Sequence, residues 1–124
     1  MPATILIVDD DDGVRSMLKL AFEAHGYEVE SAASAGQAKS LLASHSYDAV
    51  LTDMRMESDT AGYDVVRAAA AQPHPPPTVI LTAYPLLAQQ WREAGADAVL
   101  QKPVQMMGLL ELMDKLVARG KPAS

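Results

Sequence analysis

Five short runs rich in apolar and β-branched residues recur along the chain and predict five strands. The first run, Thr4-Ile-Leu-Ile-Val8, is stopped by acids and is typical of a strand buried on both faces. The predicted strands cover residues 4–8, 27–32, 48–53, 78–82 and 98–101.

Between these runs, apolar residues fall at helical spacing. In the segment after the first strand they are followed by Gly26, which predicts a left-handed cap at the end of a helix. Ser34 to Gln37 has the S-x-x-Q form of a capping box and predicts a helix that runs toward His45. An irregular stretch to Gly62 precedes a third predicted helix, at about residues 63–71.

Prolines mark the later boundaries. The run from Gln72 to Pro77 predicts a stiff connector, because proline lacks a backbone donor and restrains the residue before it. Pro85 suits the first turn of a fourth helix that ends before Gly95. After Pro103 an apolar stripe predicts the last helix, with residues 120–124 as a frayed tail; the stripe is Met106, Leu109, Leu110, Met113, Leu116 and Val117.

Strands that alternate with helices predict an α/β fold: a doubly wound, five-stranded parallel sheet with five helices. The length of 124 residues suits one domain, 1–124, with a core at about 4–119. We expect ligands to bind beyond the carboxyl ends of the strands, as in other open parallel sheets.

Composition narrows the possible partners. The chain has no cysteine, so a metal would need oxygen or imidazole ligands. A formal net charge of −6 argues against a nucleic-acid surface. No apolar run approaches a membrane span and no signal segment is evident, so we expect a cytoplasmic protein with no membrane contact.

Polar residues end four of the predicted strands: Asp9 and Asp10, then Asp53, then Thr82, then Lys102. Unit charges about 4 Å apart repel by roughly 4 kcal/mol at an effective dielectric near 20, so three carboxylates gathered at one edge need raised pKa values or a cation. Oxygen ligands of this kind suit Mg²⁺. A carboxylate nucleophile, a metal and a lysine are the parts of an aspartyl-phosphate mechanism, with Thr82 as a hydroxyl donor.

Each of these acids also has a purely structural interpretation. Asp10, Asp11 and Asp12 could cap the first helix, because acids at a helix start accept from its free amides. Asp53 alone could be an acid in a turn at a strand end. Lys102, Thr82 and the order of the elements favour a shared phosphoryl site.

Four segments resemble the receiver domain of bacterial response regulators, the phosphoacceptor of two-component signalling. They are Ile5-Leu-Ile-Val-Asp-Asp10, Asp48-Ala-Val-Leu-Thr-Asp53, Val79-Ile-Leu-Thr-Ala83 and Gly95-Ala-Asp-Ala-Val-Leu-Gln-Lys-Pro103. The resemblance covers residues 4 to about 119. It implies a flavodoxin-like sheet with strand order 2-1-3-4-5.

The resemblance also implies roles for individual residues. Asp53 would be the phosphoacceptor, with Mg²⁺ or Mn²⁺ bound directly by Asp10, by Asp53 and by the backbone carbonyl of Arg55, and through water by Asp9. Thr82 would be the switch hydroxyl. Lys102 would neutralise the phosphoryl charge, and the Lys102–Pro103 bond would often be cis.

Two stretches depart from the family pattern. Met56 is followed by Glu57 rather than proline, and Gly62 comes one position late, while Glu57 and Asp59 add negative charge beside the predicted site. Val99 stands where the family usually has an aromatic residue, three positions before Lys102. Tyr84 and Arg55, two residues after Thr82 and Asp53, are candidates for effects on signalling or dephosphorylation.

The resemblance implies a phosphorylation-dependent interaction module and not an enzyme. The phosphoryl group would come from a histidine kinase, a histidine phosphotransfer protein or a small donor such as acetyl phosphate. The output would be a downstream protein bound at the fourth helix, fifth strand and fifth helix, or a homodimer. The alternative is a receiver-like scaffold that works without phosphorylation. A dehalogenase-type phosphatase is disfavoured, because Arg55 stands where its second acid belongs.

Overall fold

The computed structural model describes residues 2–86 and 88–120. Its strands are β1 Thr4–Val8, β2 Glu28–Ala32, β3 Ala49–Asp53, β4 Thr78–Thr82 and β5 Ala98–Gln101. Its helices are α1 Asp12–Ala24, α2 Ala35–Ser44, α3 Ala61–Ala70, α4 Ala88–Ala94 and α5 Met106–Gly120. The described part of the chain thus holds the predicted alternation of strands and helices.

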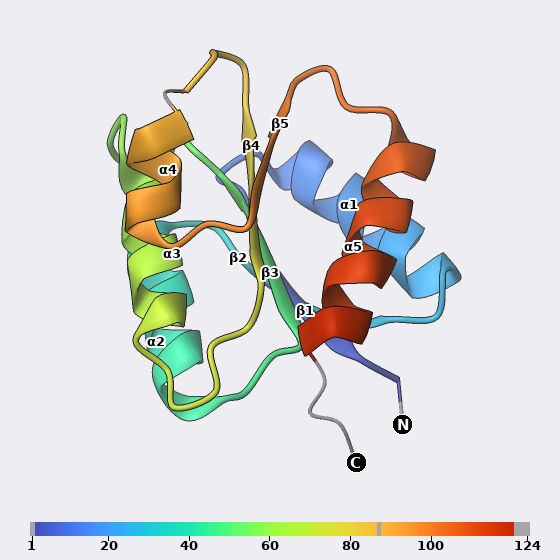
Figure 1. Cartoon of the computed structure of the whole chain (residues 1–124). Helices are drawn as coiled ribbons and strands as arrows, with labels where there is room; N and C mark the ends of the chain where they lie inside the picture. The colour runs from blue at the N-terminus through green and yellow to red at the C-terminus, as the bar shows by residue number, and fades with distance from the viewer. Residues whose placement is uncertain (1, 87, 121–124) are drawn as a thin grey trace.

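The strands form one parallel sheet in the order β2-β1-β3-β4-β5, which confirms the predicted fold. Helices α1 and α5 cover one face of the sheet, and α2, α3 and α4 cover the other (Figure 1). Apolar side chains of β1, β3 and β4 are buried on both sides, as the continuous apolar runs predict. None of the described helices has the length and apolar character needed to cross a bilayer.

Local signals placed most helix ends correctly. The Ser34 side chain accepts from the backbone N–H of Gln37 at 3.0 Å, so Ser34 is the N-cap of α2. The Gln37 side chain reaches back to the backbone N–H of Ala33 at 2.6 Å. Gly26 and Gly95 follow α1 and α4 with φ of 97° and 106°, a conformation that favours glycine.

The predicted start of the fourth helix is wrong. Pro85 lies outside any helix, and the described part of α4 begins at Ala88. The chain first makes a turn after β4, in which the Tyr84 backbone N–H donates to the Thr82 hydroxyl oxygen at 3.1 Å. At the other end of the chain, α5 includes Gly120, the first residue of the predicted tail, and residues 121–124 lie outside the described residues.

Candidate phosphoryl and metal site

Sheet register brings the predicted site residues to one edge. Val8 pairs with Thr52, so Asp9 and Asp53 continue the two strands side by side. On the other flank Thr82 pairs with Gln101, which places Lys102 immediately beyond it. Because all these strands are parallel, their carboxyl ends meet there.

Three carboxylates gather at this edge. Asp9, Asp10 and Asp53 each offer an oxygen, and these oxygens lie within 4.8 Å of one another. Asp9 is 2% exposed, and its Oδ2 atom is buried with no hydrogen-bond partner among the described residues. Burial, and then repulsion from Asp53, raises the pKa of Asp9. A buried carboxylate oxygen with no partner and two carboxylate neighbours fits a divalent cation with oxygen ligands.

The next two acids in the chain, Asp11 and Asp12, stabilise the start of α1. The Asp11 side chain accepts from the Val14 backbone N–H at 3.0 Å and is the N-cap of α1. Asp12 lies in the first turn and pairs with Arg15. The run of acids therefore divides: Asp9 and Asp10 face the site, whereas Asp11 and Asp12 begin the helix.

Lys102 approaches the cluster from β5. Its Nζ atom lies 3.1 Å from Asp53 Oδ1, which also accepts from the Met54 backbone N–H at 3.0 Å. The Lys102–Pro103 bond is cis, as expected. A lysine in this position can neutralise charge on a group attached to Asp53.

Thr82 completes the edge. It is 3% exposed, and its hydroxyl oxygen accepts from the Tyr84 backbone N–H. Its backbone carbonyl accepts from the Lys102 backbone N–H at 2.7 Å, which joins the ends of β4 and β5. A hydroxyl that only accepts here still has a proton to donate.

A hollow of about 100 Å³ opens above these side chains; it is lined by Asp53, Arg55, Thr82, Ala83, Tyr84 and Lys102. Its rim carries Arg55, whose guanidinium carbon lies 4.1 Å from the centre of the Tyr84 ring. The role of the Arg55 carbonyl toward a metal stays a prediction. The site can hold a small anionic group over Asp53.

Comparison with known proteins identifies the family. The family model described as the response regulator receiver domain matches residues 5–114. The chain belongs to this family. Curated relatives of this receiver domain include response regulator MprA of Mycolicibacterium vanbaalenii, 36% identical over 124 residues, which cover 98% of this chain and 53% of MprA. The chain thus spans about half the length of the curated relatives it matches.

Solved receiver domains share the fold. A CheY-like receiver domain protein of Methanospirillum hungatei has a TM-score of 0.88 and 31% identity, covering 97% of each chain. The receiver domain of sensor histidine kinase PA1611 from Pseudomonas aeruginosa, solved with magnesium in its active-site cleft, has a TM-score of 0.82 and 26% identity. That match covers 95% of this chain and 99% of the other.

The close packing around Gly62 leaves no room for a side chain in this receiver domain. A Cβ at Gly62 would lie 2.7 Å from the Asp53 carbonyl oxygen and 2.8 Å from the Met54 Cα. The Gly62 backbone N–H also donates to the Met54 carbonyl at 2.8 Å. Gly62, the second residue of α3, is therefore packed against the end of β3, beside the predicted phosphoacceptor.

The Glu57 carboxylate is bound at the start of α2. Its two carboxylate oxygens accept from the backbone N–H groups of Ala35 at 2.9 Å and Gly36 at 3.2 Å. Those hydrogen bonds, the one from Ala35 first, lower the pKa of Glu57. Sequence reasoning missed this contact, because nothing local to residue 57 points to a helix that begins over twenty residues earlier.

We expect Glu57→Gln to lower the free energy of unfolding by about 0.5–1 kcal/mol at pH 7, since it weakens a charged cap of α2. The pKa of Glu57 is lower in the folded chain than the ordinary glutamate value of 4.5, so the charge of Glu57 stabilises the fold fully above pH 4.5. This stabilisation is lost as the pH falls through the lowered pKa. Urea unfolding of the native chain and of Glu57→Gln at several pH values should show the difference in their free energies of unfolding shrinking below about pH 4. A difference that stays constant with pH would contradict the charged cap.

Proposed function

We propose that Asp53 accepts a phosphoryl group and that this switches a protein-interaction face of the receiver domain. The observation that carries the proposal is the cluster of Asp9, Asp10 and Asp53. Within the described part of the chain, one buried oxygen of Asp9 has no hydrogen-bond partner, and Lys102 Nζ lies 3.1 Å from Asp53. Such a site combines a nucleophilic carboxylate with fixed positive charge.

In the proposed reaction a carboxylate oxygen of Asp53 attacks the phosphorus of a phosphohistidine. A phosphorus–oxygen bond forms and the phosphorus–nitrogen bond breaks, and the histidine leaves with its electron pair. Lys102 neutralises charge on the transferred group, and the Thr82 hydroxyl donates to one of its oxygens. The donor would be the phosphohistidine of a histidine kinase or of a histidine phosphotransfer protein. With acetyl phosphate as the donor, a phosphorus–oxygen bond breaks instead and acetate leaves.

The three carboxylates would hold Mg²⁺ or Mn²⁺, Asp10 and Asp53 directly and Asp9 largely through water, with the Arg55 carbonyl as a further ligand. Such an ion supplies positive charge for the phosphoryl oxygens. The presence of magnesium in the PA1611 receiver domain supports this proposal. We propose that the output is binding and that no separate substrate is turned over.

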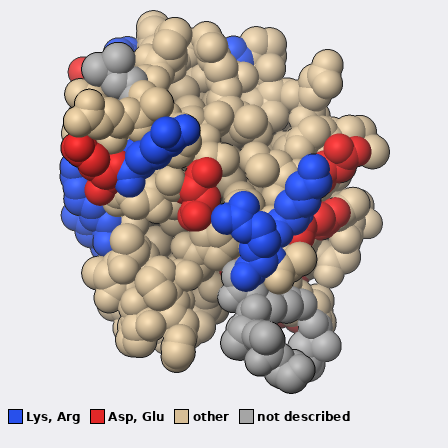
Figure 2. All heavy atoms as spheres, in the orientation of Figure 1, with Lys and Arg blue, Asp and Glu red and all other residues tan. Residues whose placement is uncertain are grey.

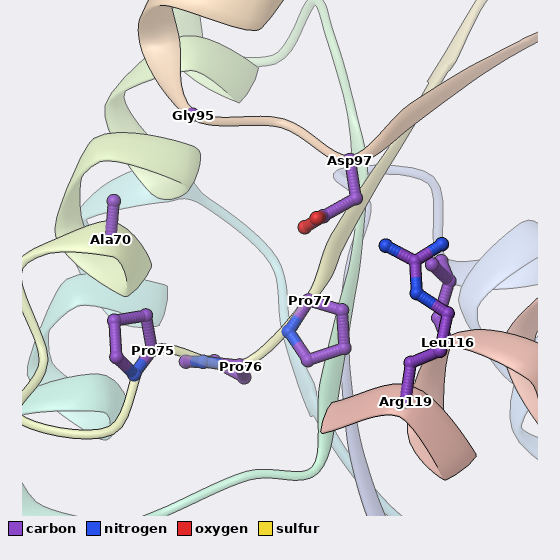
Figure 3. Close-up of a pocket in the computed structure, with 8 residues that line it drawn as sticks. All are labelled: Ala70, Pro75, Pro76, Pro77, Gly95, Asp97, Leu116 and Arg119. Atoms are coloured by element: carbon purple, nitrogen blue, oxygen red, sulfur yellow. The ribbon is translucent and has the colours of Figure 1, made fainter. Parts of the chain in front are cut away.

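The proposed output face comprises α4, β5 and α5. Acidic and basic side chains alternate across it (Figure 2), which favours a protein partner or a second copy over a nucleic acid. At its lower end a pocket of about 250 Å³ lies between the proline-rich connector and α5, and Arg119 extends toward Asp97 there (Figure 3). We propose that residues 1–124 act as one receiver domain, with its core at about 4–119.

Val99 favours one alternative, a receiver-like scaffold that binds partners without phosphorylation. It is partly buried against the cluster that contains Tyr63 and Ile80, and it has no ring that could turn toward Thr82. The two functions differ in whether Asp53 accepts phosphate.

Incubation with acetyl phosphate and Mg²⁺ is expected to add about 80 Da to the intact chain, because one phosphoryl group becomes attached to Asp53. EDTA should prevent the gain, since the carboxylates would then repel the anionic donor. Intact-mass spectrometry with and without EDTA checks this. No gain, in a chain whose melting temperature Mg²⁺ still raises, would favour the scaffold.

A further inference from the structure

The loop at residues 54–60, between β3 and α3, is fastened to the start of α2 by two consecutive residues. Glu57 accepts from the backbone N–H groups of Ala35 at 2.9 Å and Gly36 at 3.2 Å. Met56 is partly buried against the apolar cluster that contains the buried side chains of α2. Two neighbouring side chains of the loop thus make their contacts with the same helix.

Glu57 lies at the centre of a tight turn in this loop. The Met56 backbone N–H donates to the Ser58 carbonyl at 3.1 Å, so the turn closes around Glu57. The Met56 N–H and the Arg55 carbonyl belong to one planar peptide unit. The hydrogen bond that closes the turn therefore also restrains the orientation of the Arg55 carbonyl, the group proposed as a further metal ligand.

The turn depends on this anchor because burial does little to hold it. Residues 57–60 are exposed, and an exposed segment loses conformational entropy when it is ordered, without a gain from apolar contacts. Hydrogen bonds from backbone N–H groups at a helix start to a carboxylate are charge-assisted and stronger than neutral ones. The α2 helix also has a cap of its own, since Ser34 accepts from the Gln37 backbone N–H. The Glu57 carboxylate therefore orders the turn as well as capping the helix.

We propose that Glu57 is a positioning residue for the metal site: by fastening the turn to α2, it holds the Arg55 carbonyl in place to bind the divalent cation. The inference rests on the proposed function, in which Asp10, Asp53 and the Arg55 carbonyl bind that cation directly. Metal affinity rises when a ligand already occupies its bound position, because less conformational entropy is lost on binding. Occupancy of the metal site and order at the start of α2 are then coupled, and thermodynamic linkage makes the coupling reciprocal.

The test is the affinity of the full chain for Mn²⁺, measured from the electron paramagnetic resonance signal of the free ion. Glu57→Asp keeps the negative charge, but its side chain is one methylene shorter and cannot reach both N–H groups while the turn keeps its place. We expect Glu57→Asp and Glu57→Gln to lower the affinity by a similar factor, about tenfold, because both weaken the anchor. A long-range effect of charge alone would weaken binding only in Glu57→Gln. Native affinity in Glu57→Asp would therefore overturn the positioning role.

Ser34→Ala is the matched control, because it removes a cap of α2 that lies within the helix's own segment. The hydrogen bond that it deletes is the one from the Gln37 backbone N–H at 3.0 Å. The variant should be less stable than the native chain, yet its affinity for Mn²⁺ should stay within about twofold of the native value. A loss of affinity in Ser34→Ala as large as that in the Glu57 variants would show that any weakening of α2 is sufficient, and it would overturn the role of the anchor.

Amide hydrogen exchange at Ala35 and Gly36 measures the same coupling from the side of the helix, by nuclear magnetic resonance with diamagnetic Mg²⁺. Saturating Mg²⁺ should slow exchange at these two amides about tenfold in the native chain and less than twofold in Glu57→Asp. Exchange that Mg²⁺ does not slow in the native chain would overturn the inference. The proposed phosphoryl acceptance by Asp53 would then still stand, because intact mass tests it separately. A native chain that binds no Mn²⁺ would instead overturn the proposed metal site and this inference with it.

Discussion

Asp53→Asn is expected to abolish phosphoryl acceptance from acetyl phosphate in the presence of Mg²⁺. An amide is a far weaker nucleophile than a carboxylate, and it also removes one of the three charges that would hold the metal. The change is close to isosteric, so the hydrogen bond from the Met54 backbone N–H to the side-chain oxygen can remain. The measurement is intact mass, with the native chain in parallel.

Asp64→Asn is the matched control for this substitution. Asp64 is an acid in the first turn of α3, lies outside the three-carboxylate cluster and pairs with Arg67 at 3.7 Å. The Asp64→Asn variant should accept a phosphoryl group as the native chain does. If Asp53→Asn still gains mass, the acceptor is another carboxylate, and peptide mapping after hydroxylamine cleavage would show whether it is Asp10.

The second large effect concerns stability. Gly62→Ala is expected to lower the free energy of unfolding by about 2–4 kcal/mol, because the added Cβ must displace backbone and cannot be relieved by rotating a side chain. The atoms it meets are the Asp53 carbonyl oxygen at 2.7 Å and the Met54 Cα at 2.8 Å. Urea denaturation measured by circular dichroism checks the size of the loss.

Gly108→Ala separates this steric effect from the general effect of removing a glycine. Gly108 lies within α5, and a Cβ there would meet nothing within 4 Å. Alanine should therefore leave stability unchanged or raise it by about 0.5–1 kcal/mol, since it is the better helix former. If both glycine variants were equally stable, the close approach at Gly62 would not be a constraint. Because Gly62 packs beside Asp53, partial unfolding of Gly62→Ala would itself impair phosphorylation. Phosphorylation of this variant should therefore be measured only at temperatures where it is still folded.

The side chains packed between Asp53 and α4 bear on the proposed switch. Met54, the residue after Asp53, packs in the same cluster as Tyr63, Ile80 and Ala94, so a change at the phosphoacceptor has a packed route to α4. Val99 packs against this cluster. If the proposed switch moves α4, we expect the movement to alter the packing of these side chains, and the fluorescence of Trp91, which contacts the cluster, would report it.

Much of this protein could be predicted from local sequence. Continuous apolar runs that stop at polar residues located the strands, and parallel strands bring their carboxyl ends together, so Asp9, Asp53, Thr82 and Lys102 were expected at one edge. Helix caps were equally local: Ser34 and Gly26 act within a few residues of themselves. The start of α4 was misplaced, because a proline is tolerated in a turn as well as at a helix start.

Only the tertiary structure decided what the loops do. Glu57 caps α2, Arg55 stacks on Tyr84 and Gly62 packs against the end of β3. Each contact depends on how two segments are placed after the sheet has formed, and no periodicity or short-range propensity encodes that placement. The sequence by itself determined the strands, the sheet edge and the residue types that meet there. The packed fold decided which of the surrounding charges lie at the candidate site and which hold other elements in place.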